Sequence, residues 1–298
     1  MSAPAPHGPN SPATEHRIDT AVRRRLEARG QRSGPWTEFC VFVLKQAWAC
    51  LFGALMLACI VAAALWYPAG ARLARNDALT LAALAIQAGM LVLRLETARE
   101  ALVIVVFHVA GTAMEVFKTH AGSWEYAAGG VLHIGAVPLF TGFMYAAVGS
   151  YLMRVMRLFD LRFTRFPPLW LAGALAAAAY ANFFAHHWIW DARWCLVAAV
   201  VLAYGRCTMT FRVRRTTGRM PVVVAFALVA VFIWLAENIG TAAGAWAYPD
   251  QAGGWHPVSI AKLGSWFLLM QLSVFLVTLV SRPQAPEGAA PGLSASRR

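Results

Sequence analysis

Long apolar runs separated by short polar segments make up most of this chain. Eight of these runs approach the length that a membrane-spanning helix needs, about 20 residues. They cover residues 45–67, 77–94, 100–117, 136–154, 169–186, 189–206, 220–239 and 262–281. The pattern therefore predicts an all-α fold, a polytopic bundle of about eight transmembrane helices.

The composition supports this class of protein. Of the 298 residues, 59% are hydrophobic and 13% are charged, and the mean hydropathy is +0.54, outside the range of soluble domains. A net charge of +12 would suit a nucleic-acid partner, but the arginines lie between the apolar runs, so we expect no nucleic acid and interpret them as topology signals. The five cysteines show no spacing typical of a metal site.

The two ends of the chain differ from the apolar middle. Residues 1–38 are rich in Pro, Ser and Arg and are predicted to be a disordered basic tail, and residues 283–298 are predicted to be a second one. A cleaved signal peptide is not expected, because the polar start is too long and the first apolar run can span a bilayer. Residues 39–282 are predicted to form a single transmembrane domain.

The basic residues predict the orientation of this domain. With both tails in the cytoplasm, most of the 26 Lys and Arg residues fall in cytoplasmic segments. Only five fall outside: Arg72, Arg75, Lys118, Arg193 and Lys262. We therefore expect a multi-pass protein of the inner (plasma) membrane with both termini in the cytoplasm.

A twelve-residue pattern, E-x3-T-x-A-G-x-W-x-Y, occurs twice. It runs from Glu115 to Tyr126 and again from Glu237 to Tyr248. Recurrence of a Glu, a Gly, a Trp and a Tyr at the same offsets indicates an internal repeat. We predict two four-helix halves, residues 45–154 and 169–281, arranged as a parallel repeat with both copies at outer ends of spans.

Glu115 and Glu237 are the main candidates for chemistry, because an acid at the end of a span is costly unless it is paired, neutralised or hydrated. If they face each other, burial and mutual repulsion favour one shared proton, and the pair becomes a general acid and base. The alternative is that each glutamate bonds the Thr hydroxyl and backbone amides of its own turn and pins the loop.

His108 is the third candidate for chemistry. It lies seven residues before Glu115 and on the same helical face, so it is either a proton relay or metal ligand of that site or a hydrogen-bonding residue between helices. The adjacent histidines at 186 and 187 lack metal-site spacing, so no metal is predicted, and no cofactor is indicated. The candidate ligand-binding residues are Trp124, Tyr126, Trp246, Tyr248, Asn238, His133, His256, His186 and His187.

Three stretches carry a family resemblance. The runs Ala101 to Trp124, Trp234 to Thr241 and Ala261 to Trp266 resemble a family of bacterial integral membrane proteins of unknown function, domain of unknown function family 817. The likeness covers about residues 40–282, and it implies the membrane class without an activity. A looser likeness, in style only, is to membrane-embedded carotenoid cyclases and hydratases, which use acid chemistry on a polyene within the bilayer.

Three functions agree with these features. The first is a bilayer-embedded enzyme or binder for a hydrophobic, isoprenoid-like molecule, with the two glutamates at the outer leaflet. The second is a small transporter or channel that uses them as a proton or cation site, and the third is a structural protein without a ligand. The inner halves of the spans look almost wholly apolar, which favours the first and third. The expected partners are membrane lipid and a hydrophobic small molecule.

Overall fold

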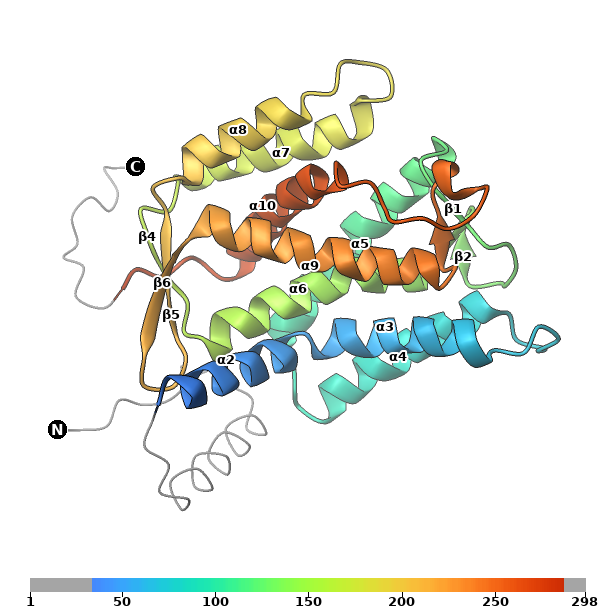
Figure 1. The fold of residues 1–298 in the computed structure, drawn as a ribbon, viewed down its shortest axis with the longest axis horizontal. Helices are drawn as coiled ribbons and strands as arrows, with labels where there is room; N and C mark the ends of the chain where they lie inside the picture. The colour runs from blue at the N-terminus through green and yellow to red at the C-terminus, as the bar shows by residue number, and fades with distance from the viewer. Residues whose placement is uncertain (1–33, 287–298) are drawn as a thin grey trace.

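Helices lying along one long axis dominate the computed structural model, which describes residues 34–286 (Figure 1). A helix overlaps each of the eight predicted runs. The helices are α2 (Pro35–Ala49), α3 (Leu51–Trp66), α4 (Arg75–Val92), α5 (Ala98–His120), α6 (Phe140–Leu158), α7 (Leu169–Ala185), α8 (Arg193–Tyr204), α9 (Val222–Ala242) and α10 (Lys262–Val280). From α3 to α10 the chain passes back and forth between the two ends of the bundle.

By length and composition, fewer than eight of these helices qualify as membrane spans. In the part of the chain that the structure describes, α5, α9 and α10 are long and apolar enough to cross a membrane, and the bent pair α2 and α3 adds a fourth if it counts as one span. Helices α7 and α8 are apolar but shorter. The structure thus shows a helical fold compatible with a membrane protein, and the count of eight spans stays a prediction.

Helix α2 extends the predicted first span toward the N-terminus. It begins at Pro35, inside the stretch predicted to be a tail, and meets α3 at a 66° bend. Its polar side chains hold it in place: the Glu38 carboxylate accepts hydrogen bonds from the Arg215 backbone N–H and the Thr216 hydroxyl, at 3.3 and 2.8 Å. Residues 1–33 and 287–298 lie outside the described residues, so the predicted tails remain predictions there.

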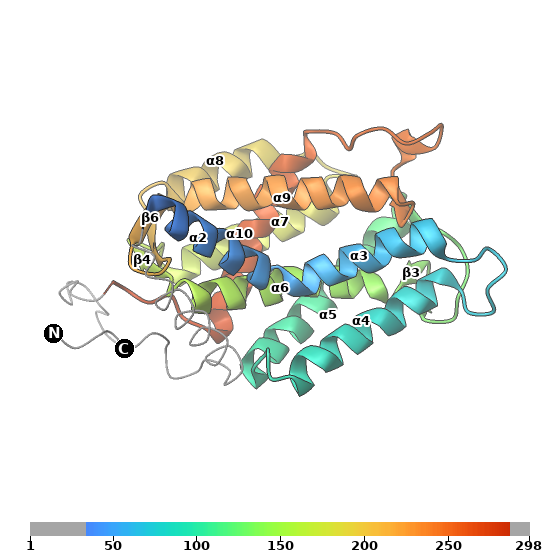
Figure 2. The same ribbon diagram turned by 60° about the horizontal axis from the view of Figure 1, so that its bottom comes forward.

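The all-α prediction missed a three-stranded antiparallel sheet at one end of the bundle, here called the sheet end (Figure 2). It consists of β4 (Arg162–Thr164), β5 (Thr208–Arg212) and β6 (Thr217–Pro221), in the order β4-β5-β6. Polar and apolar residues alternate from Thr208 to Val213, which is a strand pattern. The many arginines nearby led us to interpret this segment only as a topology signal.

The opposite end of the bundle carries both copies of the repeat and is called the glutamate end. Strands β1 (Glu125–Tyr126) and β7 (Trp246–Ala247) pair there, next to the hairpin of β2 (His133–Ile134) and β3 (Val137–Pro138) and the short 3₁₀ helix η1 (Pro249–Gln251). In Figure 1 this end lies opposite the sheet. The fold therefore brings the two glutamate turns together.

Close packing of α5 on α6 forms the centre of the bundle. Gly149 of α6 lies against Phe107 of α5, and a Cβ at that glycine would approach the ring to 2.9 Å. Gly142 likewise lies against His108. Small residues allow two helices to approach closely in a membrane protein, so these glycines set the spacing of α5 and α6.

Candidate functional site

The carboxylate of Glu115, near the end of α5, accepts three hydrogen bonds from aromatic side chains. Its Oε2 atom accepts from the Trp124 Nε1–H at 2.8 Å and from the Tyr126 hydroxyl at 2.5 Å. Its Oε1 atom accepts from the Tyr145 hydroxyl of α6 at 2.6 Å. Glu115 is 3% exposed, so these donors replace the water that a carboxylate otherwise needs.

Glu237, near the end of α9, is bonded in a similar way. Its Oε1 accepts from the Tyr248 hydroxyl, and its Oε2 accepts from the Trp266 Nε1–H of α10 at 2.7 Å. Glu237 is 4% exposed. Trp246, the second copy's counterpart of Trp124, lies instead against Gly240, where a Cβ would overlap its indole ring.

A glycine after each helix makes this geometry possible. Gly122 follows α5 with φ +68°, and Gly244 follows α9 with φ +62°, a conformation that residues with a Cβ rarely adopt. The chain therefore turns back, and the tyrosine eleven residues after each glutamate reaches its carboxylate. The repeat threonines donate to the backbone carbonyls of Glu115 and Glu237, at 2.8 and 3.0 Å, and not to the carboxylates as the loop-pin alternative supposed.

The two copies meet through β1 and β7. Glu125 pairs with Ala247, its own counterpart in the second copy, and Tyr126 pairs with Trp246. Across this contact, the Trp124 and Tyr248 rings meet edge to face with centroids 6.0 Å apart. We call the assembled residues the glutamate cluster: Glu115, Trp124, Tyr126, Tyr145, Glu237, Tyr248, Lys262 and Trp266.

Lys262 adds a positive charge to the glutamate cluster. Its ammonium lies 4.0 Å from the centroid of the Tyr248 ring and 5.5 Å from that of Trp124, within the range of cation–π attraction. The sequence predicts that Lys262 lies outside the membrane and indicates no role for it. Tyr145 and Trp266 were not predicted as site residues, because they lie beyond the repeat and reach the glutamates only through helix packing.

The phenols of this cluster are fixed donors. Burial, and then the negative charge of the bonded glutamate, raise the pKa of Tyr126 and Tyr248 well above the ordinary value for tyrosine. Both hydroxyls therefore stay protonated at neutral pH. No hydrogen bond joins the two carboxyl groups directly, as far as residues 34–286 show.

His108 lies apart from these carboxylates. Its ring packs against Phe143 with centroids 4.6 Å apart, and its Nδ1 atom has no hydrogen-bond partner among the described residues. The Thr112 hydroxyl, one helical turn nearer to Glu115, also lacks a partner there. The structure thus places His108 on the α5–α6 seam without a contact to Glu115.

Three of the predicted ligand-binding residues form hydrogen bonds with backbone groups. His133 Nδ1 lies 2.7 Å from the Gly135 carbonyl oxygen, and His256 bonds the carbonyl oxygens of Asp250 and Pro257. The Asn238 amide donates to the Trp234 carbonyl and accepts from the Val258 N–H, at 2.8 and 2.9 Å. All three fix connections at the glutamate end and do not contact the carboxylates.

His186 and His187, which follow α7, surround the amine of Lys118 from α5. The Lys118 Nζ atom lies 3.0 Å from His187 Nε2 and 3.5 Å from either ring nitrogen of His186. Lys118 is 2% exposed. Within the described residues, no group of three His, Cys, Asp or Glu side chains has the arrangement of a metal site.

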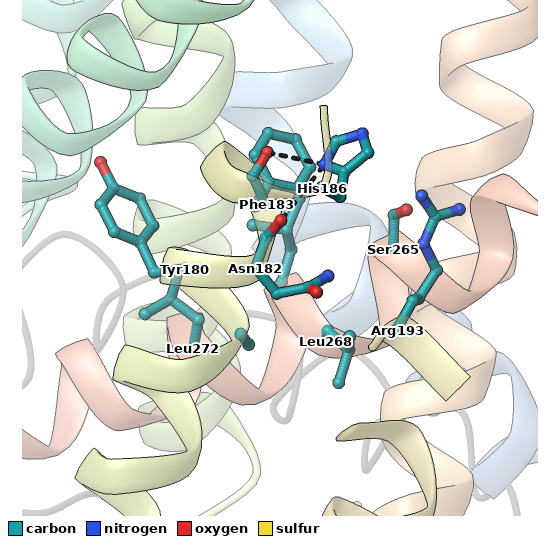
Figure 3. A pocket seen from close by; sticks show the side chains of 10 residues that line it. Tyr180, Asn182, Phe183, His186, Arg193, Ser265, Leu268 and Leu272 are labelled. Atoms are coloured by element: carbon teal, nitrogen blue, oxygen red, sulfur yellow. Dashed lines mark hydrogen bonds between the residues drawn. The ribbon is translucent and has the colours of Figure 1, made fainter. Parts of the chain in front are cut away.

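A small cavity adjoins this lysine–histidine group (Figure 3). It holds about 20 Å³, enough for roughly one water molecule. The polar residues that line it are Tyr180, Asn182, His186, Arg193 and Ser265. The Asn182 amide donates to Asp191 Oδ1 at 3.0 Å and its oxygen accepts from the Ala192 N–H, so the loop between α7 and α8 is fixed beside the cavity.

The expectation of almost wholly apolar inner halves does not hold at the sheet ends of α5 and α6. Glu100 of α5 is 2% exposed, Arg154 of α6 is fully buried, and Glu96, just before α5, is 6% exposed. The Ser150 hydroxyl donates to Glu96 Oε1 at 2.6 Å, and Glu100 forms an ion pair with Arg157. Hydropathy averaged over a run does not reveal charges that satisfy one another between neighbouring helices.

Comparison with known proteins gives structural and sequence relatives. The mycobacterial Insig homologue MvINS from Mycobacterium vanbaalenii matches with a TM-score of 0.46 and 15% identity, covering 63% of this chain and 98% of that one. A cross-linked trimer of MvINS matches with the same values. The uncharacterized protein YoaT of Bacillus subtilis (strain 168) is 39% identical over 251 residues, which are 83% of this chain and 94% of YoaT.

The family resemblance noted in the sequence rests on segments that contain five of the eight residues of the glutamate cluster. The model of a family of proteins of unknown function, DUF817, matches residues 38–274, which include every residue of that cluster. This match and the similarity to YoaT cover most of the helical bundle. The chain therefore belongs to the DUF817 family.

Proposed function

We propose that this protein binds a hydrophobic, isoprenoid-like molecule within the bilayer and that the glutamate cluster holds the polar end of that molecule. The observation that supports this proposal is the pairing of β1 with β7, which assembles one site from two distant segments. Two buried carboxylates and a lysine in an apolar protein are costly to maintain, and membrane proteins retain such groups chiefly for function. The aromatic rings around them offer an apolar wall beside the charges.

The geometry favours binding over acid–base turnover by the two glutamates. Three of the lone-pair positions of Glu115 and two of Glu237 are occupied by fixed Tyr and Trp donors. A general base needs a free position within reach of the substrate proton. Lys262, whose ammonium lies over two rings, is better placed to meet a polar group of the ligand.

The proposal includes the eight-span topology, with both termini in the cytoplasm of the cell and the glutamate end at the outer leaflet. Support comes from the spacing of the repeat: α6 begins at Phe140 and α10 at Lys262, the same number of residues after the two glutamates. In addition, Glu125 pairs with its own counterpart, which is the register that a two-fold axis produces. Both features fit a parallel repeat.

Cysteine labelling tests this topology. Cysteines introduced at Ser123 and Ala252, at the glutamate end, should react with an impermeant thiol reagent in intact cells. A cysteine at Thr216, at the sheet end, should react only after the cells are opened. A variant without the five native cysteines is the background, and labelling of Thr216→Cys from outside would refute the orientation.

Mass spectrometry of bound lipids tests the binding proposal. Protein purified in nanodiscs should carry a compound that is depleted by about tenfold or more in Glu115→Gln and Lys262→Gln, because tenfold corresponds to about 1.4 kcal/mol of lost binding free energy. Glu125→Gln is the matched control, since Glu125 is exposed and lies in the same turn. Identical lipid profiles in all four proteins would exclude a ligand at this cluster.

A transporter is the second candidate, favoured by the polar groups at both ends of the α5–α6 seam. The buried layer of Val103, Phe107 and Ala146 separates the charged groups near the sheet end from Glu115. Such a layer is typical of a closed pathway. In vesicles with a pH gradient, the protein should then speed proton or cation flux, and Glu115→Gln should abolish the increase. Equal leak with and without the protein would exclude this candidate.

A further inference from the structure

Lysine is rare in this chain. The sequence contains 23 arginines but only three lysines, Lys45, Lys118 and Lys262. The Lys45 amine donates to backbone carbonyl oxygens, including those of Leu158 and Val213 at 2.7 and 2.5 Å. Arginine therefore supplies the general positive charge, and two of the three lysines lie at the glutamate end.

Lys118 is the most buried of the three lysines. It is 2% exposed, and its ammonium lies 4.3 Å from the centroid of the Phe183 ring. Its polar neighbours are the imidazoles of His186 and His187, with no carboxylate in ion-pair contact anywhere in residues 34–286. A desolvated amine without a counter-ion loses its proton more readily than an exposed one, which is the condition for a nucleophilic lysine.

The two histidines can accept this proton. Burial, and then the positive charge of Lys118, lower the pKa of His186 and of His187, so both imidazoles are neutral at pH 7. His187 Nε2 lies 3.0 Å from the amine, within direct reach for proton transfer. The Ser123 hydroxyl lies 3.2 Å from the same nitrogen and orients the ring.

We propose that Lys118 is a nucleophilic amine that forms a Schiff base with an aldehyde or ketone group of the hydrophobic ligand. This inference rests on the proposed binding function and names the chemical class of the ligand. Lysine, unlike arginine, provides an amine that can be deprotonated and can attack a carbonyl carbon. Lys118 is thereby distinguished from the arginines of the chain by its chemistry as well as by its burial.

The reaction balances without a further reagent. His187 takes one proton from the ammonium, the amine nitrogen bonds to the carbonyl carbon, and the carbonyl oxygen receives the proton back to give a carbinolamine. The hydroxyl then leaves with the second amine proton as water, and a protonated C=N bond remains. The cavity beside His186, of about 20 Å³, has room for the released water and polar groups to hold it (Figure 3).

Reductive trapping tests this inference. The protein in nanodiscs is incubated at pH 7 with farnesal, an isoprenoid aldehyde, reduced with sodium cyanoborohydride and digested for peptide mass spectrometry. We expect the reduced adduct on Lys118 at a level about tenfold or more above that on Lys45 and Lys262, which serve as internal controls. Lys118→Arg should lose the adduct while keeping the charge, and His187→Gln should slow its formation.

Two outcomes would overturn the proposal that Lys118 forms a Schiff base. Either the three lysines are modified equally, or Lys118 stays unmodified while the native ligand is still depleted in the Glu115→Gln protein. In the second outcome the binding proposal stands and only the covalent step fails. If instead Lys118 is trapped selectively but lipid profiles are the same in wild type and Glu115→Gln, the amine is reactive and the role of the glutamate cluster in binding is refuted.

Discussion

The two glutamates occupy equivalent places in two copies of one pattern, yet their partners differ. Glu115 accepts from three aromatic donors, two of them in its own turn. Glu237 accepts from two, one in its own turn and one from the following helix. The shared element is the tyrosine eleven residues after each glutamate. The pattern thus preserves a buried carboxylate with a phenol donor, and the remaining donors vary.

One substitution between the copies accounts for much of this difference. Three residues after the glutamate, the first copy has Lys118 and the second has Gly240. Gly240 leaves room for the Trp246 ring, which therefore lies on the helix and does not bond the carboxylate. Trp266 of α10 supplies the missing N–H. The same position thus holds a buried amine in the first copy, and in the second copy it lets the tryptophan pack on the helix without bonding the glutamate.

The largest expected effect comes from removing each carboxylate. Glu115→Leu leaves three buried donors without an acceptor and Glu237→Leu leaves two, at about 1–3 kcal/mol for each group left unsatisfied. Glu115→Leu should therefore lose more stability, measured as the fraction of folded protein left after heating in detergent. Glu125→Leu, at an exposed position, should stay within about 0.5 kcal/mol. A greater loss in Glu237→Leu would contradict the donor count.

Filling the space beneath Trp246 should lower stability by less than removing a carboxylate does. Gly240→Ala places a methyl group within the Trp246 ring, and such overpacking costs about 1–3 kcal/mol. We expect a lower thermal midpoint and a shifted tryptophan emission. Gly253→Ala is the control, because a Cβ there meets no atom within 4 Å. Equal midpoints for the two variants would show that the ring has room to move.

Removing one hydrogen-bond donor from each glutamate should reveal a further difference between the two sites. Tyr145→Phe leaves Glu115 with two donors, whereas Trp266→Phe leaves Glu237 with one. A double-mutant cycle with the corresponding Glu→Leu change isolates each hydrogen bond, about 1.5–3 kcal/mol for one to a charged group. The Glu237–Trp266 coupling should be the larger. The order would be reversed if the other donors of Glu115 could not compensate for loss of Tyr145.

The smallest expected effect on stability is the one that the buried tyrosines produce at alkaline pH. Because burial and the neighbouring glutamates raise the pKa of Tyr126 and Tyr248 in the folded protein, the unfolded chain loses these protons first as the pH rises above 10. The contribution of these two tyrosines to the free energy of unfolding is thus fully present below pH 10 and is lost as the pH rises above it. Thermal midpoints between pH 9 and 12 should fall less steeply in Tyr126→Phe,Tyr248→Phe than in the wild type. Parallel slopes would contradict the raised pKa values.

Much of the architecture could be predicted from the apolar runs. Each run contains a helix, because about 20 apolar residues in a row bury their backbone polar groups only as a helix. The antiparallel sheet at the sheet end was missed, since the alternation from Thr208 to Val213 is short and arginines lie on both sides of it. The bend at Cys50 between α2 and α3 was also missed, because no Pro or Gly marks it.

The candidate site could be predicted only in part. The repeat identified Glu115, Glu237 and their tyrosines, because identical spacing indicates identical local geometry. It did not identify Tyr145 or Trp266, which come from the next helices. Lys118 was noted only as a charge outside the membrane, since its contact with His187 joins residues 69 positions apart.

The sequence by itself determined the helices, the two glycine turns and the phenol facing each carboxylate, because all of these depend on residues within one helix and its following turn. The tertiary structure alone decided that the two turns pair through β1 and β7, that Lys262 lies between rings of both copies, and that Lys118 faces two histidines. These contacts depend on how helices distant in sequence pack against one another. Periodicity and spacing along a chain record which face of a helix is polar, and they do not record which helix that face meets.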